Sequence, residues 1–497
     1  MKLYLRGHDY RYAVEQMLVT LFPGQRPEYP EGRPDRTAPA ALLALEQAGE
    51  SLTAHATLWW EGCEYSAVQA APVSELTGGL ADDRVRQRIL RLAFYDAGVQ
   101  ALGQEPAWGA LTGMRPVKLP TRWMASGASP EEARTILTEE YRVSAGRADL
   151  AMDCAAAALA VKQALRPDEL SLYLGIPFCP TRCAYCSFIS ADVKGAMALV
   201  EPYVDALCRE IGAAGRQLKR RGLHIPTAYM GGGTPTTLSA GQLDRVLSAM
   251  EEHLPLDRCR EFTVEAGRPD TITADKLEVL RAHGVHRISI NPQTMEDEVL
   301  RIMGRAHTAA QIESAMALAE QHFGGLVNMD LIAGLPGDSP GGFGRTLSRV
   351  LAMAPANITV HTLALKKGAR LMEERGQLCS DADVAQMLAM AEEALRGAGY
   401  VPYYLYRQKY MSGSFENVGW CLPGTECAYN IIMMEELQSV LSLGAGGVTK
   451  LVNPATGRID RLTNPKYPRE YLDSWDKIAA DKAAAAEFQA NLHRFGS

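Results

Sequence analysis

Three closely spaced cysteines are the residues of this 497-residue chain whose type and spacing best suit chemistry. Cys179, Cys183 and Cys186 follow a short apolar run in the pattern C-x₃-C-x₂-C. Soft thiolates in a tight loop can hold three irons of a [4Fe-4S] cluster, and the fourth iron is then left without a protein ligand. An open iron can chelate the amino and carboxylate groups of S-adenosylmethionine, which is the start of radical chemistry. Zinc is the alternative, but zinc sites favour four closed ligands and no second C-x₂-C pair follows.

A glycine-rich run lies one predicted strand–helix unit further along the chain. It reads Met230-Gly-Gly-Gly-Thr-Pro-Thr-Thr-Leu238, and its glycines leave the backbone open to close approach by a ligand. As an isolated motif, such a run is most often a structural turn. Its position after the cysteine motif predicts instead a site for the amino-acid end of S-adenosylmethionine.

Polar side chains mark the next three predicted strands. Glu265 ends the third strand, Gln293 follows the fourth and Asp330 lies within the fifth. Any one of them alone could be a capping or satisfied polar group, whereas the three together suit a ribose and an ammonium group. Arg305 offers a two-pronged guanidinium for a carboxylate.

These residues need a scaffold that brings distant segments to one edge. Six short β-rich runs alternate with helix-length connections between about Leu170 and Leu365, as parallel βα units do. Closed or partly closed barrels and doubly wound sheets both satisfy this α/β pattern, and both place ligands at the carboxyl ends of the strands. The predicted strands are 172–176, 228–231, 262–265, 288–290, 327–332 and 358–363.

The flanks of this segment have a different pattern. Residues 1–165 begin with a strand-like run, alternate apolar and polar residues near Leu58 to Val68 and become helical from Asp82 onward, so they predict an α+β extension. Arg166-Pro167-Asp168 breaks the helical pattern and marks a boundary. We predict three domains, which are the extension at 1–165, the α/β segment at 166–400 and a smaller, aromatic-rich section at 401–497.

Composition predicts a soluble cytoplasmic protein. The ten cysteines show no even spacing, which argues against a secreted disulfide scaffold. The chain has neither a secretory h-region at its start nor an apolar run long enough to span a membrane. A net charge of -7 without a basic low-complexity tract argues against bulk binding of nucleic acid.

Taken together, the motifs resemble radical S-adenosylmethionine enzymes of the oxygen-independent coproporphyrinogen III oxidase (HemN/HemW-like) group, most closely its HemZ or coproporphyrinogen dehydrogenase branch. The resemblance covers roughly residues 165 to 450. The family motifs are Tyr173-Leu-Gly-Ile-Pro-Phe-Cys179, Gly231-Gly-Gly-Thr-Pro235, Asn328-Met-Asp-Leu-Ile-Ala-Gly-Leu-Pro-Gly337 and Glu416-Asn-Val-Gly419. The features of the branch are Glu265-Ala-Gly-Arg-Pro-Asp270, Asn291-Pro-Gln-Thr294, His361-Thr-Leu-Ala-Leu-Lys366 and an N-terminal extension with Trp108-Gly-Ala-Leu-Thr-Gly-Met-Arg-Pro116.

The resemblance implies a partial (β/α)₆ barrel, with the [4Fe-4S] cluster at its mouth on the three cysteines, and a small C-terminal domain. It also implies that S-adenosylmethionine is bound by Gly231, Gly232, Glu265, Gln293, Arg305 and Asp330. Tyr173, six residues before Cys179, matches a functional tyrosine of the family. An ordinary aromatic on a buried strand is the alternative interpretation of Tyr173.

The activity that the resemblance implies is oxidative decarboxylation. A hydrogen atom would leave the β-carbon of a propionate, and loss of CO₂ and one more electron would leave a vinyl group. Two such reactions convert coproporphyrinogen III into protoporphyrinogen IX, with electrons from a donor such as flavodoxin or ferredoxin. Candidate cationic partners for the propionates, at least half of them expected to be solvated instead, are Arg268, Lys366, Lys367, Arg370, Arg407 and Lys409.

Two departures from the oxidase pattern keep other functions open. The characterised oxidase has a histidine four residues before the first cluster cysteine and a cysteine two residues after the last, where this chain has Gly175 and Phe188. Phe188 resembles the HemW relatives, which implies a haem-binding or trafficking protein as one alternative. Another is a different radical enzyme on a tetrapyrrole, such as a methyltransferase that opens haem. Cys421 and Cys427 could help to hold a second metal, but simple burial or surface placement is the expectation.

Overall fold

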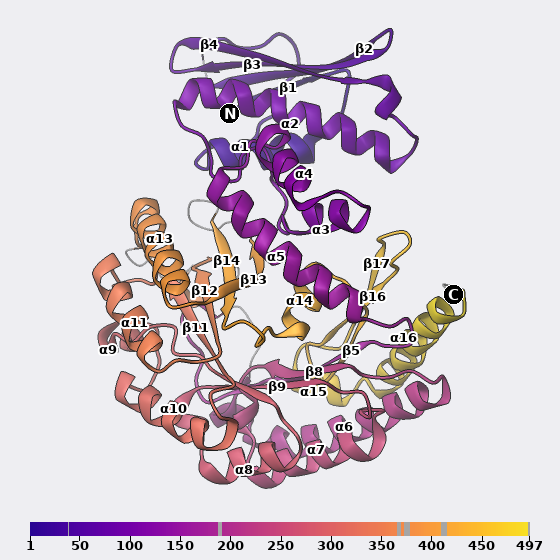
Figure 1. Ribbon diagram of the computed structural model, residues 1–497, viewed down its shortest axis with the longest axis vertical. Coiled ribbons are helices and arrows are strands. Elements are labelled where there is room, and N and C mark those ends of the chain that lie inside the picture. The colour runs from indigo at the N-terminus through magenta and orange to yellow at the C-terminus, as the bar shows by residue number, and fades with distance from the viewer. Residues whose placement is uncertain (38, 187–190, 365–368, 372–377, 409–414, 496–497) are drawn as a thin grey trace. The chain divides into compact units, whose positions relative to one another are not determined.

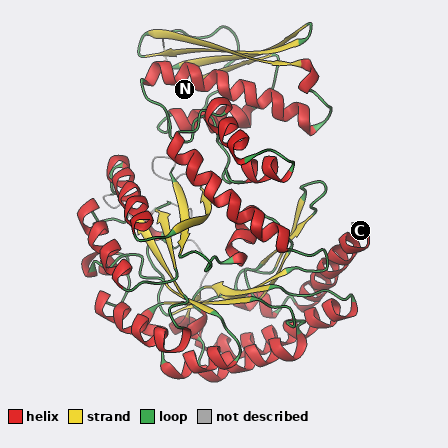
Figure 2. Cartoon of the chain, viewed as in Figure 1, coloured by secondary structure: helices red, strands yellow, loops and turns green. Residues whose placement is uncertain are grey.

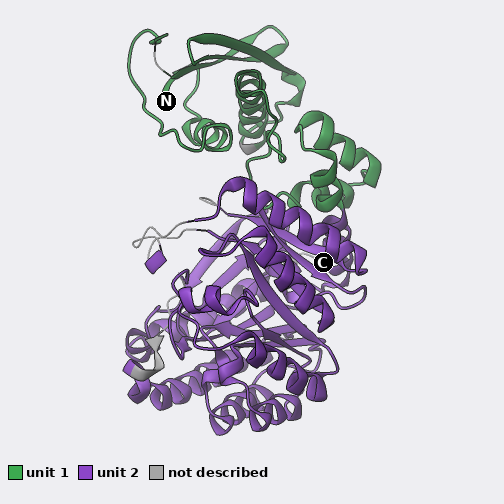
Figure 3. Cartoon of the chain, turned by 90° about the vertical axis from the view of Figure 1, so that its left-hand side faces the viewer, with its two compact units in different colours: residues 1–152 green, residues 153–497 purple. Residues whose placement is uncertain are grey.

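The computed structural model describes residues 1–497 other than 38, 187–190, 365–368, 372–377, 409–414 and 496–497. The chain forms two compact units, Met1–Met152 and Asp153–Ser497 (Figure 3). Their boundary falls inside helix α5 (Ala145–Ala164), which ends just before the predicted break at Arg166-Pro167-Asp168. The division into three domains stays a prediction, and the strands beyond residue 400 pair into the same sheet as those before it.

The first unit is an α+β structure on a four-stranded sheet, ordered β1 (Lys2–Arg6), β2 (Ala40–Ala48), β3 (Ser51–Trp60) and β4 (Cys63–Pro72). β1 pairs parallel with β2, and the other neighbours pair antiparallel. Burial alternates along much of β3, so one face of the sheet packs on α2 (Leu80–Leu102), which also contacts α1 (Arg11–Leu21). The short helices α3 (Lys118–Ala125) and α4 (Pro130–Thr135) follow.

The second unit contains an eleven-stranded sheet, and the predicted strands are confirmed within it. Each of the six β-rich runs forms a strand, and the six pair parallel in chain order. Their side chains are mostly buried, because both faces of a parallel sheet are covered. They are β5 (Ser171–Ile176), β8 (Thr227–Gly232), β9 (Glu261–Gly267), β10 (Arg287–Ile290), β11 (Val327–Ala333) and β12 (Asn357–Thr362).

Helices connect these strands along the outer face of the sheet (Figures 1 and 2). Capping boxes fix the starts of three of them, with Ser239 before α7, Thr308 before α10 and Ser380 before α13. Because each crossover returns the chain to the same edge, the carboxyl ends of the strands lie together there. The helices are α6 (Val193–Arg220), α7 (Ala240–His253), α8 (Ala274–Ala282), α9 (Asp297–Ile302), α10 (Ala309–Phe323), α11 (Pro340–Ala352) and α13 (Asp381–Gly397).

Later segments extend this sheet at both edges. β14 (Glu416–Cys421) pairs antiparallel with β12 and with β13 (Val401–Arg407), while β15 (Val440–Leu443) pairs parallel with β5. No helix in the described residues is both long and apolar enough to cross a membrane. The remaining elements are the separate pair β6 (Phe178–Cys179) and β7 (Ala191–Asp192), then α14 (Ala428–Glu435), β16 (Val448–Val452), β17 (Ile459–Thr463), α15 (Pro468–Leu472) and α16 (Trp475–Phe495).

A buried polar network ties the C-terminal segment to α6. The Lys482 ammonium lies 3.1 Å from the Glu210 carboxylate. That carboxylate also accepts hydrogen bonds from the Tyr471 hydroxyl and from the backbone N–H of Gly444. Both charges are almost fully buried, so each depends on the other for compensation.

Candidate active site

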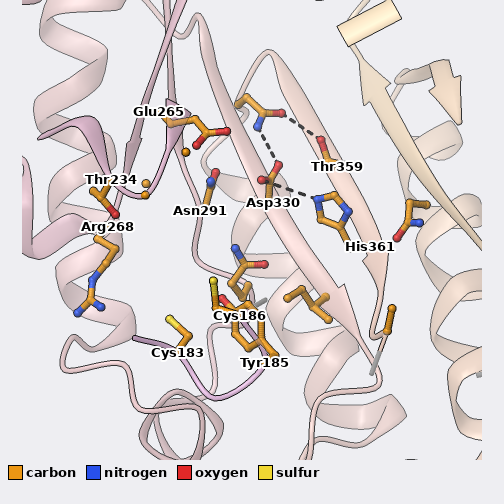
Figure 4. A pocket seen from close by; sticks show the side chains of 18 of the residues that line it. Cys183, Tyr185, Cys186, Thr234, Glu265, Arg268, Asn291, Asp330, Thr359 and His361 are labelled. Carbon is orange, nitrogen blue, oxygen red and sulfur yellow. Dashed lines mark hydrogen bonds and ion pairs between the residues drawn. The ribbon is translucent and has the colours of Figure 1, made fainter. Parts of the chain in front are cut away.

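A cavity of about 390 Å³ lies where the parallel strands end. Its walls come from the segments after β5 and β10, from β8 and β9 with the residues that follow them, and from β11, β12, β13, β14 and α14, and Figure 4 shows polar side chains that line it. Residues far apart in the sequence therefore meet at one place, as the strand pattern predicted. Of the predicted site residues, all except Gly231 and Tyr173 line the cavity, namely Cys179, Cys183, Cys186, Gly232, Glu265, Gln293, Arg305 and Asp330.

The glycine run has a packing role at two of its positions. A Cβ atom at Gly231 would lie 3.0 Å from the Glu265 carboxyl, so this glycine makes room for that side chain. A Cβ atom at Gly233 would lie 2.5 Å from the carbonyl oxygen of Phe178, so no other residue fits there without a backbone shift. Gly232 and Gly233 line the cavity, and Gly231 does not. A ligand contact by Gly231 stays a prediction.

Tyr173 lies on β5 and does not line the cavity. Its ring stacks on the ring of Tyr229, with 6.4 Å between the centroids, and Tyr229 does line the cavity. Burial raises the pKa of the Tyr173 hydroxyl well above its usual value, which keeps that hydroxyl neutral. The functional role implied for Tyr173 therefore stays a prediction.

The three cysteines line the cavity but do not form a ready-made metal site. None of the three is in a disulfide, and all are partly buried. Cys179 Sγ lies 3.5 Å from Thr234 Oγ1 of the glycine run, and Cys186 donates its backbone N–H to the carbonyl of Cys183. Within the described residues, no three His, Cys, Asp or Glu side chains are gathered closely enough to hold a metal ion. Cluster ligation stays a prediction from the spacing and chemistry of the thiols.

Glu265 is a carboxyl group with a strongly perturbed protonation. Its Oε1 accepts a hydrogen bond from the Tyr229 hydroxyl at 2.7 Å. Burial raises the pKa of Glu265 to about 7, and the neighbouring Asp330 carboxylate adds to the rise, while the Tyr229 hydrogen bond opposes it. A cation placed beside Glu265 would favour its ionised form, so this side chain suits an ammonium or sulfonium group.

Asp330 is held ionised by its neighbours (Figure 4). Asn328 donates to Asp330 Oδ1 at 2.8 Å, and the His361 imidazole lies 3.8 Å from Oδ2. Burial alone would raise the pKa of Asp330, but the contacts with His361 and Asn328 outweigh it, so the pKa lies below its usual value. Thr359 donates to the Asn328 carbonyl oxygen at 3.3 Å and so orients the amide. Two neighbouring carboxyl groups, Glu265 and Asp330, thus differ in protonation.

Arg305 is buried beside the cysteine loop. Its Nη1 donates to the backbone carbonyl of Asn291 at 2.6 Å, and its Nη2 donates to the Tyr185 hydroxyl at 3.1 Å. Its Nε is buried and has no hydrogen-bond partner. A buried guanidinium with an unused N–H is open to an anionic ligand, because leaving that donor unpaired costs free energy.

Gln293 has the backbone geometry of a constrained site residue. Its φ of 69° lies in the left-handed region, which side chains other than glycine seldom adopt. Backbone hydrogen bonds on both sides hold it there, from Gln293 N to the Asp330 carbonyl and from Ile332 N to the Gln293 carbonyl. Its side-chain oxygen is buried and unpartnered, as is the Asn291 side-chain oxygen nearby in sequence.

These unpartnered groups test whether the cavity fits the cofactors that the motifs imply. The cavity offers three soft thiols, an unused guanidinium N–H, unpaired amide oxygens and two carboxyl groups. Native proteins seldom leave buried polar atoms without partners unless a water or ligand completes them. Carboxylate, amino and hydroxyl groups of an amino-acid nucleoside would complete these, so the residues present fit S-adenosylmethionine beside a thiolate-bound cluster.

Sequence reasoning missed part of the site. Tyr229, Asn328, Thr359, Tyr404 and Tyr406 all line the cavity, as do other residues of β12, β13, β14 and α14. Because side chains on a strand alternate between its two faces, the sequence could have indicated which of these residues share a face. No sequence pattern indicated that β13 and β14 pair antiparallel beside β12. His361 was noted only as part of a family motif, and it proves to be the neighbour of Asp330.

The cations predicted for propionates have mixed placements. Arg268 lines the cavity but is buried and bonded to Asp270. Arg407 is buried and does not line the cavity, and burial lowers its pKa to about 10. Arg370 does not line the cavity either. Lys366, Lys367 and Lys409, like Phe188, lie outside the described residues.

Cys421 and Cys427 are buried in a hydrophobic cluster, as the interpretation of simple burial expected. Cys427 Sγ donates to Glu261 Oε1 at 3.2 Å, and the same carboxylate accepts the backbone N–H groups of Ala428 and Tyr429 at the start of α14. Burial raises the pKa of the Cys421 thiol to about 12. Both environments favour the neutral thiol over a metal-binding thiolate.

Comparisons with known proteins agree with this geometry. The family model described as the radical SAM superfamily matches residues 173–350. The chain is 40% identical over 380 residues, 76% of each chain, to the oxygen-independent coproporphyrinogen-III oxidase-like protein HemZ of Bacillus subtilis. It is 29% identical to the heme chaperone HemW of Escherichia coli, over 66% of this chain and 82% of that one. The solved coproporphyrinogen III oxidase HemN from Escherichia coli shares the fold, with a TM-score of 0.51, 24% identity and coverage of 65% of this chain and 73% of that chain.

Proposed function

The chain belongs to the radical SAM superfamily, among relatives of HemZ, HemW and HemN, and from this premise we propose that it decarboxylates propionate groups of coproporphyrinogen III to vinyl groups. The observation that carries the proposal is the similarity, over 76% of both chains, to a protein named as coproporphyrinogen-III oxidase-like. The product of two such reactions would be protoporphyrinogen IX, made without oxygen in a haem-forming pathway of the cytoplasm.

The cofactors of the proposal are a [4Fe-4S] cluster and S-adenosylmethionine. Cys179, Cys183 and Cys186 would hold the cluster, and the partial (β/α)₆ barrel predicted for the fold would present it at the strand ends. The bound pair supplies one-electron reduction and removal of a hydrogen atom from an unactivated carbon. The electrons would come from a small donor such as flavodoxin or ferredoxin.

The chain's own residues would bind and orient the nucleoside. The unused Nε of Arg305 suits a carboxylate, and Glu265 suits the cationic end of the ligand. Asp330, held by Asn328 and His361, is an ionised acceptor aimed by its neighbours at hydroxyl groups such as those of a ribose. Gly232 and Gly233 leave the backbone of the run open at the cavity wall.

An aromatic part of the cavity wall supports a tetrapyrrole substrate. Tyr404, Tyr406 and His361 line it together with Asn417 and Asn430. The rings of Tyr404 and Tyr406 stack with centroids 6.5 Å apart, so they present a broad apolar surface edged with polar groups. A porphyrinogen has separate pyrrole rings joined by saturated bridges, and those rings and their N–H groups match that surface.

A second candidate is haem binding without turnover, which the similarity to the HemW chaperones supports. The same aromatic wall would then hold the product-like macrocycle rather than a substrate.

Anaerobic turnover tests the two candidates against each other. Reconstituted protein is mixed with coproporphyrinogen III, dithionite and S-adenosylmethionine, and products are read by mass spectrometry, with Cys183→Ala as the matched control. Vinyl products together with 5′-deoxyadenosine support decarboxylation. Tight binding of haem with no vinyl product overturns decarboxylation and favours the haem-binding function.

A further inference from the structure

A buried arginine holds the cysteine loop against the end of β9. Arg268 Nε and Nη2 donate to the two oxygens of Asp270 at 2.9 and 3.0 Å. Its Nη1 donates to the Thr181 hydroxyl at 2.6 Å, and Thr181 lies between the first two cysteines of the motif. All three nitrogens of this guanidinium therefore already donate hydrogen bonds within the protein.

A second arginine contacts the other half of the same loop. Arg305 Nη2 donates to the hydroxyl of Tyr185, which lies between the second and third cysteines. His307 stands between the two arginines, with Nε2 3.5 Å from Arg305 Nη1 and Nδ1 3.6 Å from Asp270 Oδ1. We call the four side chains of Arg268, Asp270, Arg305 and His307 the loop clamp.

The local backbone makes the Arg268–Asp270 pair rigid. Pro269 begins a short 3-10 turn, and the N–H of Thr271 donates to the Arg268 carbonyl at 3.0 Å. A fixed proline φ and a closed turn keep the two flanking side chains facing each other. Both Arg268 and His307 are buried, so water does not compete for these contacts.

The clamp also carries charge. The clamp contains two guanidinium groups and one carboxylate, so its net charge beside the three-thiol loop is positive. A buried positive charge favours thiolates over thiols, and it favours a more reduced cluster, because each added electron makes the cluster more negative.

We propose that Arg268 is a positioning residue, which fixes the orientation of the cysteine loop through Thr181 and Asp270 and makes the bound cluster easier to reduce. This inference rests on the proposed function only in that the loop must carry a [4Fe-4S] cluster. Substrate identity does not enter it. Outer contacts of this kind commonly change metal retention by roughly 10- to 100-fold.

Two variants of one residue separate geometry from charge. Arg268→Met removes both, whereas Arg268→Lys keeps the charge and loses the two-pronged contact with Asp270. The matched control is Arg245→Met, which removes a guanidinium that contacts Glu201 and Asp205 at the surface, far from the cysteine loop in sequence. Each protein is reconstituted anaerobically without any tetrapyrrole. The rate of iron loss to a chelator is then measured. The reduction potential of the cluster is measured by electron paramagnetic resonance during a redox titration.

We expect Arg268→Met to lose iron about tenfold faster than wild type and to have a lower potential. Arg268→Lys should lose iron faster at a near wild-type potential, and Arg245→Met should match wild type in both. Folded Arg268→Met with wild-type retention and potential overturns the proposal.

A milder variant serves if Arg268→Met fails to fold. Thr181→Val removes only the hydroxyl that accepts from Arg268, at a partly buried loop position. Faster iron loss in Thr181→Val supports the proposal, and wild-type behaviour overturns it. Because the readouts need no substrate, a failed turnover assay leaves this result intact, whereas wild-type protein that takes up no cluster overturns the proposed function and this inference together.

Discussion

The Tyr229 hydroxyl donates a hydrogen bond to Glu265 across 2.7 Å, inside a cavity where burial raises the pKa of Glu265 to about 7. Glu265 is therefore poised to lose a proton when a cationic ligand arrives. The tyrosine opposes the rise in pKa, because its hydrogen bond favours the ionised carboxylate.

Ligand binding should release a proton below pH 7. S-adenosylmethionine carries a cationic sulfonium, which favours ionised Glu265. With a pKa near 7, roughly three quarters of a proton should leave at pH 6.5, measured by calorimetry in buffers of different ionisation heat. Tyr229→Phe removes the opposing hydrogen bond, so release should extend to higher pH. Glu265→Gln should abolish this release, and an unchanged release in that variant would contradict the assignment.

Stability of the ligand-free protein should fall as pH rises through the same range. The folded-state pKa of about 7 lies above the usual value of about 4.5 for a glutamate, so the folded protein binds more protons between these two values. The free-energy cost of burying ionised Glu265 is absent below about pH 4.5 and complete above about pH 7. Glu265→Gln should match wild type at pH 4 and exceed it at pH 8 by at most about 3 kcal/mol, as read from urea unfolding. Equal stability at pH 8 would argue that Glu265 is solvated.

The strained backbone at Gln293 should lower the stability of the fold, while its side chain should strengthen S-adenosylmethionine binding. With φ at 69°, Gln293→Gly relieves the left-handed strain and should stabilise the protein by about 1 kcal/mol, net of the extra freedom of the unfolded chain. Gln293→Ala keeps the strain and serves as the control. Both variants lose the side-chain amide and should weaken S-adenosylmethionine binding. Thermal unfolding in which the glycine variant is less stable than the alanine variant would show that this backbone is unstrained.

Removal of the Asp330 charge should weaken S-adenosylmethionine by about ten- to a hundredfold, because a charge-assisted contact is worth roughly 1.5 to 3 kcal/mol. Asp330→Asn keeps the shape of the side chain, and Asp275→Asn at the exposed start of α8 is the control. Equilibrium dialysis gives the affinity, with iron content measured in parallel. Unchanged affinity in Asp330→Asn would place the nucleoside elsewhere.

Truncation should succeed at one boundary and fail at another. A chain that starts at Asp153 keeps the second half of α5, whose Ala158 packs in the cluster that holds Tyr403 and Tyr429. A chain that starts at Pro167 loses this contact and should be less stable. We expect the longer form to be folded and to cleave S-adenosylmethionine once loaded with a cluster. Loss of cleavage from a soluble, loaded form starting at Asp153 would show that the first unit completes the site.

The local pattern of apolar residues predicted the strands of the parallel sheet. The six β-rich runs became six parallel strands because burial on both faces leaves a continuous apolar pattern. Glu265 and Asp330 were found because strand ends of parallel sheets converge. The sequence also predicted the helix end near Arg166. The compact units nevertheless divide earlier, within α5, because the second half of this helix packs in the cluster that contains Tyr403 and so belongs to the second unit.

Relationships set by tertiary contact could not be predicted in the same way. Arg268 was a candidate partner for a substrate propionate, but Asp270 and Thr181 occupy its guanidinium. Nothing in the spacing of Tyr229 and Glu265 indicates that β8 and β9 place them within hydrogen-bonding distance. Such pairs depend on strand register, which a single sequence specifies only weakly where both faces of a strand are buried.

The pairing of β5 with β15 sets an order of events during synthesis. The cysteine loop follows β5, but the neighbour of β5 on one side spans Val440–Leu443, and the Glu210 ion pair needs Lys482, which lies far along the chain from the cysteines. A ribosome releases the loop long before it releases these supports. The strand that presents the thiols thus reaches its final packing only after these later segments have left the ribosome, so a cluster inserted earlier would enter a loop whose strand still lacks one neighbour.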